Sequence, residues 1–264
     1  MLFLTHHKCA SAWLSSVLHS YYVQRQRERV FHSYKSEEFP ENPSDYRYLL
    51  LINADYPFLR DKITRAVHVI RDPLSVVVSA YFSHLSVHPV DRWPLLAAQR
   101  QRLQSLSEEE GMEATFEFLS RPAFDDGVVG PLWGMSHFDY DDNRILTIRM
   151  EDLVAEPQVV LPRAFSFLGE ACPAELLSQL DDHSFKIKSG GRDLGMVDPT
   201  AHYRSGNPTD WVNHLSLMCA RTIYHSHKPF MDRFYPMTAA MLGVETGGIQ
   251  PVTAAKHREP ALSA

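Results

Sequence analysis

Cysteine is scarce in this sequence, and its few cysteines are poorly placed for pairing. The three cysteines are Cys9, Cys172 and Cys219, and no two of them form a C-x-x-C pair. Disulfide frameworks and cysteine-based zinc sites both depend on closely spaced pairs. We therefore expect neither, and the composition favours a reducing, cytoplasmic location.

Long apolar runs and an excess of positive charge are also missing. No stretch approaches the roughly eighteen apolar residues of a membrane-spanning helix, and the apolar start at residues 1–4 is too short for a signal peptide. The formal net charge is −6, which argues against broad nucleic-acid binding. We expect no membrane span and no nucleic-acid partner, so any anion site must be a local basic pocket.

Histidine, in contrast, is abundant, yet it forms no recognised metal-binding pattern. The closest groupings among the 14 histidines are His6-His7, His84 with His88, and His225 with His227. None is joined to an acidic residue as in the H-E-x-x-H pattern of zinc enzymes. We therefore expect no metal site.

The first informative segment is a strand, a polar turn and a helix at the start of the chain. Residues 1–4 predict a strand, and the helical spacing of apolar residues after the turn predicts a helix over about 12–26. The turn carries Lys8 and Ser11. An ammonium, a hydroxyl and the N–H groups of a helix start together suit a phosphate or sulfate. The alternative is that Lys8 is a solvated loop residue.

The same turn lacks glycine, and this absence bears on the class of nucleotide. Loops of the G-x-x-x-x-G-K-S/T type need glycine so that the backbone can wrap around the phosphates. An ordinary ATP or GTP hydrolase is therefore disfavoured.

Further strands are predicted by short apolar runs at about 29–34, 48–52, 66–70 and 145–149. The run at 48–52 is apolar almost throughout, as in strands buried on both faces of a parallel sheet. Strands alternating with helices predict an α/β fold: a three-layer sandwich with a central, mostly parallel sheet and helices on both faces. We expect one domain over residues 1–243, with a helical insert at about 87–142 and a disordered tail over 244–264.

Two later segments offer further cations. Arg71 directly follows the strand at 66–70, and Ser79 lies eight residues further on, in the next helix. The segment Arg204-Ser205-Gly206 offers a guanidinium, a hydroxyl and an unencumbered backbone N–H to one anion. The alternative for Arg71 is a local ion pair with Asp72.

Taken in order, these segments resemble the motifs of the sulfotransferases that use 3′-phosphoadenosine 5′-phosphosulfate (PAPS). The first loop is similar to the 5′-phosphosulfate loop of that family, P-K-S-G-T-T-W, with Lys8, Ser11 and Trp13 at matching places. The stretch from Val69 to Ser79 resembles the 3′-phosphate motif of the family. The resemblance covers most of residues 1–215, with gaps in the middle.

The third segment resembles the R-K-G…G-D-W motif, which closes over the same phosphate. Arg204-Ser205-Gly206 matches its first part and Asp210-Trp211 its second. The family also places an aromatic residue near the adenine, which implies that Phe185 stacks on it. The alternative is that Phe185 is a core aromatic residue.

The resemblance implies transfer of a sulfuryl group from PAPS to a hydroxyl or amine acceptor, without a metal. The product of the donor would be 3′-phosphoadenosine 5′-phosphate (PAP), and Lys8 would stabilise charge on the leaving 5′-phosphate. The acceptor would be a small molecule or a glycan, and the protein a monomer or a homodimer. The residues implied to bind the donor are Lys8, Cys9, Ala10, Ser11, Ala12, Trp13, Arg71, Ser79, Phe185, Arg204, Ser205 and Gly206.

Departures from the family pattern lie in the first loop and in the last motif. In the first loop His7 replaces proline, Ala10 replaces glycine and Ala12 replaces threonine, which removes one hydroxyl contact. Ser205 replaces a lysine and removes one charge. We therefore expect weaker donor binding than is usual in the family.

The general base is left open between two residues. Many relatives place a histidine directly after the strand that here continues into Asn53-Ala54-Asp55, and this sequence has none there. Asp55 would need a pKa raised toward the working pH to act as the base, and otherwise it forms a turn. His32, after the second strand, is the other candidate.

Two other functions also remain open. The same order of strand, lysine, serine and helix would also suit an ATP-dependent small-molecule kinase. Such a kinase needs a magnesium-binding carboxylate, for which Asp55 or Asp72 is available. A non-catalytic nucleotide-binding relative would keep the fold with a weakened site.

Overall fold

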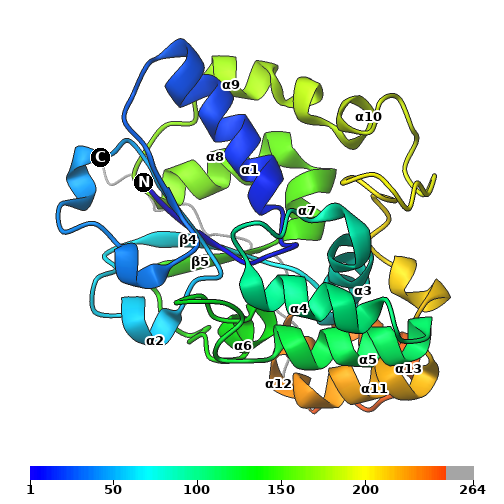
Figure 1. The fold of residues 1–264 in the computed structure, drawn as a ribbon. Coiled ribbons are helices and arrows are strands. Elements are labelled where there is room, and N and C mark those ends of the chain that lie inside the picture. The colour runs from blue at the N-terminus through cyan, green and yellow to red at the C-terminus, as the bar shows by residue number, and fades with distance from the viewer. Residues whose placement is uncertain (248–264) are drawn as a thin grey trace.

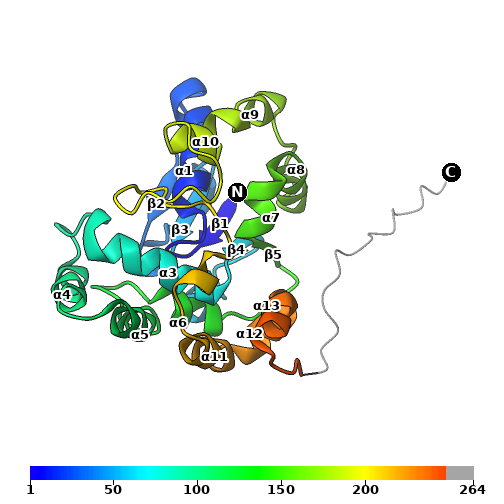
Figure 2. The ribbon, with the colours of Figure 1, turned by 90° about the vertical axis from the view of Figure 1, so that its right-hand side faces the viewer.

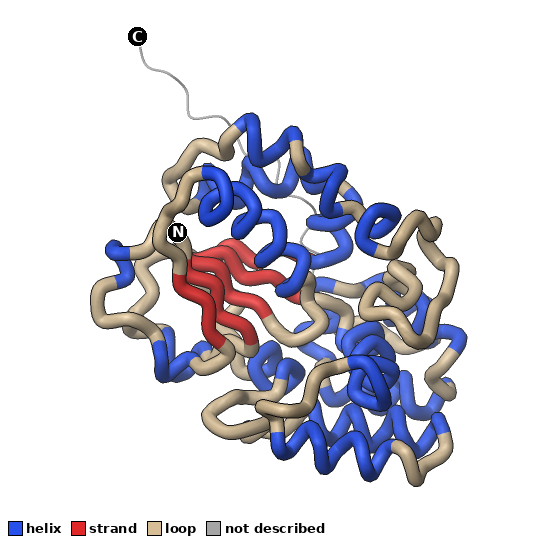
Figure 3. The backbone as a smooth tube through the Cα atoms, turned by 45° about the horizontal axis from the view of Figure 1, so that its top comes forward, coloured by secondary structure: helices blue, strands red, loops and turns tan. Residues whose placement is uncertain are grey.

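The computed structural model describes residues 1–247, and its centre is a five-stranded parallel sheet (Figure 3). The strands are β1 (Leu2–Thr5), β2 (Phe31–Ser33), β3 (Leu49–Ile52), β4 (Ala66–Ile70) and β5 (Ile145–Arg149). They lie in the order β2-β3-β1-β4-β5, and every neighbouring pair is parallel. The carboxyl end of β1 therefore lies between those of β3 and β4.

Helices cover both faces of this sheet (Figures 1 and 2). In chain order the α-helices are α1 (Ser11–His19), α2 (Tyr56–Leu59), α3 (Pro73–Phe82), α4 (Pro94–Leu103), α5 (Glu108–Leu119), α6 (Pro131–Ser136), α7 (Met150–Ala155), α8 (Pro157–Phe167), α9 (Ala174–Ser178), α10 (Phe185–Lys188), α11 (Leu217–Ser226), α12 (Lys228–Phe234) and α13 (Pro236–Leu242). Because side chains alternate along a strand, Phe3 and Leu50 pack with α1 and α8. Leu4 and Leu51 face the opposite layer. The predicted three-layer α/β architecture is confirmed.

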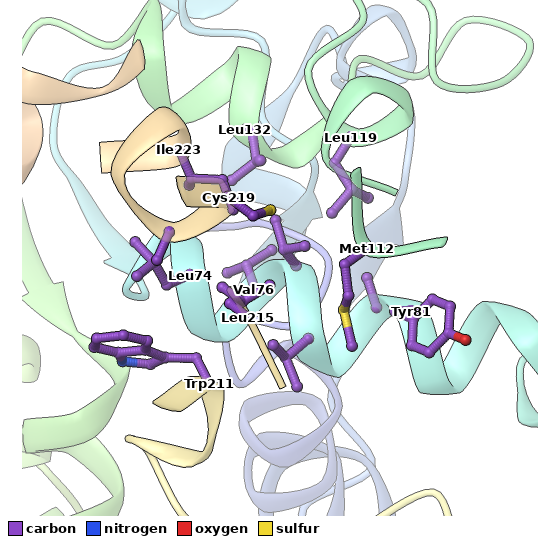
Figure 4. Close-up of a cluster of buried hydrophobic side chains, with 14 of the residues drawn as sticks. Leu74, Val76, Tyr81, Met112, Leu119, Leu132, Trp211, Leu215, Cys219 and Ile223 are labelled. Carbon is purple, nitrogen blue, oxygen red and sulfur yellow. The ribbon is translucent and has the colours of Figure 1, made fainter. Parts of the chain in front are cut away.

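A large buried cluster beside α3 gathers residues that are far apart in the sequence (Figure 4). Leu74 of α3 lies in one cluster with Met112 of α5 and with Cys219 and Ile223 of α11. The insert predicted at about 87–142 contains α4, α5 and α6, and it contributes to this cluster. The insert is therefore part of the packed core rather than a loose lid.

The predicted start of the helix that follows the Arg204 segment is wrong. The sequence pattern predicts it from about Val212, with Thr209 or Asp210 as the N-cap. Residues 210–213 instead form one 3₁₀ turn, and α11 begins at Leu217. The Ser216 hydroxyl caps α11 by accepting the N–H of Cys219 at 3.3 Å, so a second, unrecognised cap sets the boundary.

The sequence pattern Ser105-x-x-Glu108 predicts a capping box, but the box that forms at the start of α5 joins Ser107 and Glu110. The sequence contains two overlapping Ser-x-x-Glu matches, and their surroundings decide between them. Ser105 belongs to the turn that ends α4, where its backbone N–H and its hydroxyl both donate to the carbonyl of Arg102, so α5 begins after it.

No helix within residues 1–247 combines the length and the apolar character needed to cross a membrane. The tail predicted to be disordered spans 244–264, and its residues 248–264 lie outside the described part of the chain. One domain over residues 1–243 stays a prediction.

Candidate functional site

The turn between β1 and α1 has an unusual backbone. Lys8 and Ala10 have φ values of 68° and 57°, in the left-handed region that costs an L-residue roughly 1–2 kcal/mol. Ala10 is the N-cap of α1 and provides no side-chain hydrogen bond to the helix start. The first N–H groups of α1 are thus left for an anion, at the positive end of the helix dipole.

Lys8 and Arg71 meet at this helix start. Arg71 follows β4, the neighbour of β1, and its Nη1 donates a 3.0 Å hydrogen bond to the Lys8 carbonyl. Its Nε is buried and has no hydrogen-bond partner in the described part of the chain. Burial, and then the charge of Arg71, lower the pKa of Lys8 to about 7. Two adjacent cations of this kind mark a pocket suited to an anion.

The local ion pair between Arg71 and Asp72, the alternative for Arg71, is not found among residues 1–247. Asp72 instead caps α3 by accepting the N–H of Leu74 at 2.9 Å, and it accepts the hydroxyl of Thr238 at 2.9 Å. The Arg71 guanidinium is therefore turned toward the loop of Lys8.

The remaining loop residues differ in accessibility. Ser11 is half-buried and Ala12 is exposed at the first turn of α1, whereas Cys9 and Trp13 are buried. Burial raises the pKa of the Cys9 thiol, so only its backbone is available to an anion. Trp13 Nε1 donates to the His183 carbonyl at 3.0 Å, which ties α1 to the segment that leads to Phe185.

The Arg204 segment lies across α3. The Arg204 guanidinium stacks 4.2 Å from the centre of the Phe82 ring, and the Ser75 hydroxyl donates to the carbonyl of Pro208 at 2.5 Å. Ser79 is half-buried and shares the helix face of Ser75 and Phe82 because it lies four and three residues from them. The fold thus brings Ser79 and the Arg204 segment to one side of α3.

Polar groups of the Arg204 segment already have partners within the protein. The Arg204 guanidinium forms an ion pair with Asp210, and both side chains are largely buried. The Ser205 hydroxyl accepts a backbone N–H two residues further on, at 3.1 Å. Gly206 has a φ of 66°, and a Cβ there would lie 2.7 Å from the Phe185 ring. The absence of a side chain at Gly206 therefore leaves room for the Phe185 ring, while phosphate binding by Arg204 and Ser205 stays a prediction.

The two predicted general bases lie in different surroundings. Asp55 is the N-cap of α2, and its carboxylate accepts the N–H of Phe58 at 3.4 Å. His32 lies on the edge strand β2, and with Ser11 it lines a groove of about 680 Å³. Burial of the ring, and then the charge of His19, lower the pKa of His32. Neither residue has a feature that singles it out as the base.

Four histidines that the sequence did not assign to the site gather around Lys8. They are His7, His84, His88 and His202. Burial lowers the pKa of each, and the charge of Lys8 lowers it further. The spacing of His84 and His88 is the only local signal of this group, since the other two come from distant segments. Within residues 1–247 no three His, Cys, Asp or Glu side chains are placed to hold a metal ion.

Comparisons with known proteins agree with this geometry. A model of the sulfotransferase domain family matches residues 2–234, and no curated protein sequence matches the chain significantly. The mouse sulfotransferase SULT7A1 complexed with PAP matches with a TM-score of 0.58 at 15% identity, over 92% of this chain and 86% of that chain. Retinol dehydratase in complex with androsterone and inactive cofactor PAP matches with a TM-score of 0.54 at 12% identity, over 87% of this chain and 80% of that chain. These structures show a shared fold, and because the family model spans nearly the whole sequence, the chain belongs to the sulfotransferase family.

Proposed function

We propose that the protein transfers a sulfuryl group from PAPS to a hydroxyl or amine acceptor and releases PAP. The observation that carries the proposal is the meeting of Lys8 and Arg71 at the uncapped start of α1. A second support is that two structures sharing the fold over most of the chain were both solved with PAP. We propose a small molecule or a glycan as the acceptor.

The residues would act mainly by position and charge. Sulfuryl transfer, like phosphoryl transfer, needs an in-line acceptor and cations along the oxygens of the donor. The N–H groups of α1, the Ser11 hydroxyl and the Lys8 ammonium would hold the 5′-phosphate. Lys8 would also stabilise the charge that develops on the leaving oxygen. Arg71 and Ser79 would bind the 3′-phosphate, and the half-buried Phe185 would stack on the adenine.

The alternative of a small-molecule kinase has less support. A kinase needs a carboxylate that is free to hold magnesium. Asp72 is buried and already accepts two hydrogen bonds, and Asp55 caps α2. Burial, and then the charge of Glu151, raise the pKa of Asp72 to about 7, which opposes an ionised role.

The test combines binding and turnover. Calorimetry should show that the protein binds PAP. Incubation with labelled PAPS and a panel of alcohols, phenols, amines and sugars, in the presence of EDTA, should give a sulfated product. Lys8→Ala should lower turnover by about 10²-fold or more, whereas Lys62→Ala, an exposed lysine after α2, should not.

Three other outcomes would contradict the proposed activity. Failure to bind PAP at high micromolar concentration would remove the donor assignment. Binding without turnover across the panel would identify a non-catalytic relative, and magnesium-dependent phosphate transfer would identify a kinase.

A further inference from the structure

A π-helical turn, Ser83–Val87, continues α3 and turns two histidines toward the Lys8 loop. The N–H of His88 donates to the Ser83 carbonyl five residues earlier, at 2.7 Å. Such turns are rare and are frequently found at functional sites. The rings of His84 and His88 lie 6.1 Å apart, and their centres lie 5.1 Å and 5.0 Å from that of His7, the residue before Lys8.

The backbone of this turn is held from a second element. Arg100 of α4 donates from Nε to the His84 carbonyl at 2.7 Å and from Nη2 to the His88 carbonyl at 2.5 Å. One planar guanidinium thus fixes both histidines, which limits the motion of the turn.

His88 differs from His7 and His84 in the hydrogen bonds that its ring nitrogens form. His7 and His84 are buried and share a hydrogen bond between their Nε2 atoms at 3.0 Å. His88 is half-buried, and its Nδ1 lies 2.7 Å from the Pro89 carbonyl. A carbonyl only accepts, so Nδ1 carries the proton and Nε2 holds a lone pair. No group among residues 1–247 forms a hydrogen bond with this Nε2.

We propose that His88 is the general base that takes the proton of the acceptor hydroxyl, an inference that rests on the proposed sulfuryl transfer. The proton moves to Nε2 of His88 while the acceptor oxygen forms a new bond to sulfur. The bond between sulfur and the bridging oxygen of the 5′-phosphate breaks, and its electron pair stays on that phosphate, beside Lys8.

The charged groups around His88 keep it neutral near pH 7. Burial lowers its pKa below the ordinary 6.5, and the hydrogen bond to Pro89 opposes this shift. The charges of Lys8, His202 and Arg100 lower the pKa further. His7 and His84 face it as neutral rings because burial lowers their own pKa values well below 6.5. His88 is therefore in the form that accepts a proton.

The kinetic test compares two kinds of acceptor. Glutamine at position 88 can still donate to the Pro89 carbonyl but cannot take a proton, so His88→Gln should lower kcat for an alcohol by about 10²–10⁴-fold. A nitrophenol that is already ionised in water needs no base, so its kcat should fall by less than about threefold. The affinity for PAP should not change, and His225→Gln, an exposed histidine on α11, should behave as wild type. Equal losses for both acceptors, or normal turnover of the alcohol, would overturn the assignment.

Two further measurements separate this inference from the proposed function. With the alcohol, the wild-type kcat/KM should fall with decreasing pH through a value below 6.5, and His88→Gln should lose this dependence while Asp55→Asn and His32→Gln keep it. Imidazole ¹⁵N spectra require no acceptor and should show His88 as the Nδ1–H tautomer. An Nε2–H tautomer in a protein that binds PAP would overturn the inference and leave the proposed function standing, whereas absent PAP binding would overturn the proposed function and the inference with it.

Discussion

Binding of PAP should place a proton on Lys8. In the free protein, burial and Arg71 hold the pKa of Lys8 at about 7, so at pH 8 about nine tenths of the molecules carry a neutral amine. A phosphate against this amine favours its charged form and moves the pKa back toward its ordinary value. Each binding event should therefore take up about 0.9 proton at pH 8 and about 0.5 proton at pH 7.

Linkage then determines how affinity depends on pH. Between pH 7 and the pKa of Lys8 in the complex, the bound state holds more protons than the free state. PAP affinity must therefore fall as the pH rises, by up to about tenfold per pH unit. Well below pH 7, Lys8 is charged in both states and contributes no slope, although the phosphates of PAP, with a second pKa of about 6, then titrate themselves.

Calorimetry at pH 8 in buffers of different ionisation enthalpy measures this uptake directly. The wild type should show about 0.9 proton per PAP, and His88 and His202 should contribute little because their pKa values lie below 6.5. Lys8→Met should bind more weakly and take up almost none, while Lys62→Met should match the wild type. Zero uptake by the wild type, or equal uptake by Lys8→Met, would refute the contact between Lys8 and the 5′-phosphate.

Three further outcomes concern stability and the adenine side of the site. Ala10→Gly should stabilise the protein by about 1 kcal/mol in urea unfolding, because a positive φ is costly for alanine and not for glycine. The control Ala12→Gly, inside α1, should destabilise the protein by about 0.5–1 kcal/mol. A loss of stability in Ala10→Gly would contradict the expected strain at Ala10. Gly206→Ala should weaken PAP binding more than Gly195→Ala, since both sites have positive φ but only a Cβ at Gly206 would meet the Phe185 ring; equal losses would remove Phe185 from the account. The histidines that are fully or almost fully buried, with pKa values lowered by burial, include His6, His7, His68 and His84. The unfolded chain takes up protons at these residues below about pH 6.5 and the folded chain does not, so the free energy of unfolding should fall by up to about 1.4 kcal/mol per histidine per pH unit below 6.5. Urea titrations from pH 7.5 to 5.5 measure this, and an unchanged free energy would contradict it.

Strand positions could be predicted because they depend on short-range pattern. The strands predicted at 66–70 and 145–149 coincide with β4 and β5, since an apolar run with polar flanks leaves little choice of boundary. Helix starts were harder to predict. Ser105 and Ser107 satisfy the same capping pattern, and only the end of α4 decides which one caps α5.

The candidate site also combines features that the sequence could predict with features that it could not. Lys8 and Arg71 follow strands that become neighbours in the sheet, and the carboxyl ends of parallel strands share an edge, so their proximity could be predicted. The ion pair of Arg204 with Asp210 and the cap formed by Asp55 could not. Each depends on a side-chain partner that several nearby polar groups could equally have supplied.

The sequence by itself predicted the alternation of strands and helices and a turn at Lys8 suited to an anion, because these follow from local periodicity and side-chain chemistry. Only the tertiary structure decided what surrounds Lys8. It places Arg71 from the end of β4, His88 from the π-helical turn after α3 and His202 from a late loop around one lysine. The packing of α3 and its neighbours against the sheet fixes these contacts, and that packing depends on side chains spread over the whole chain.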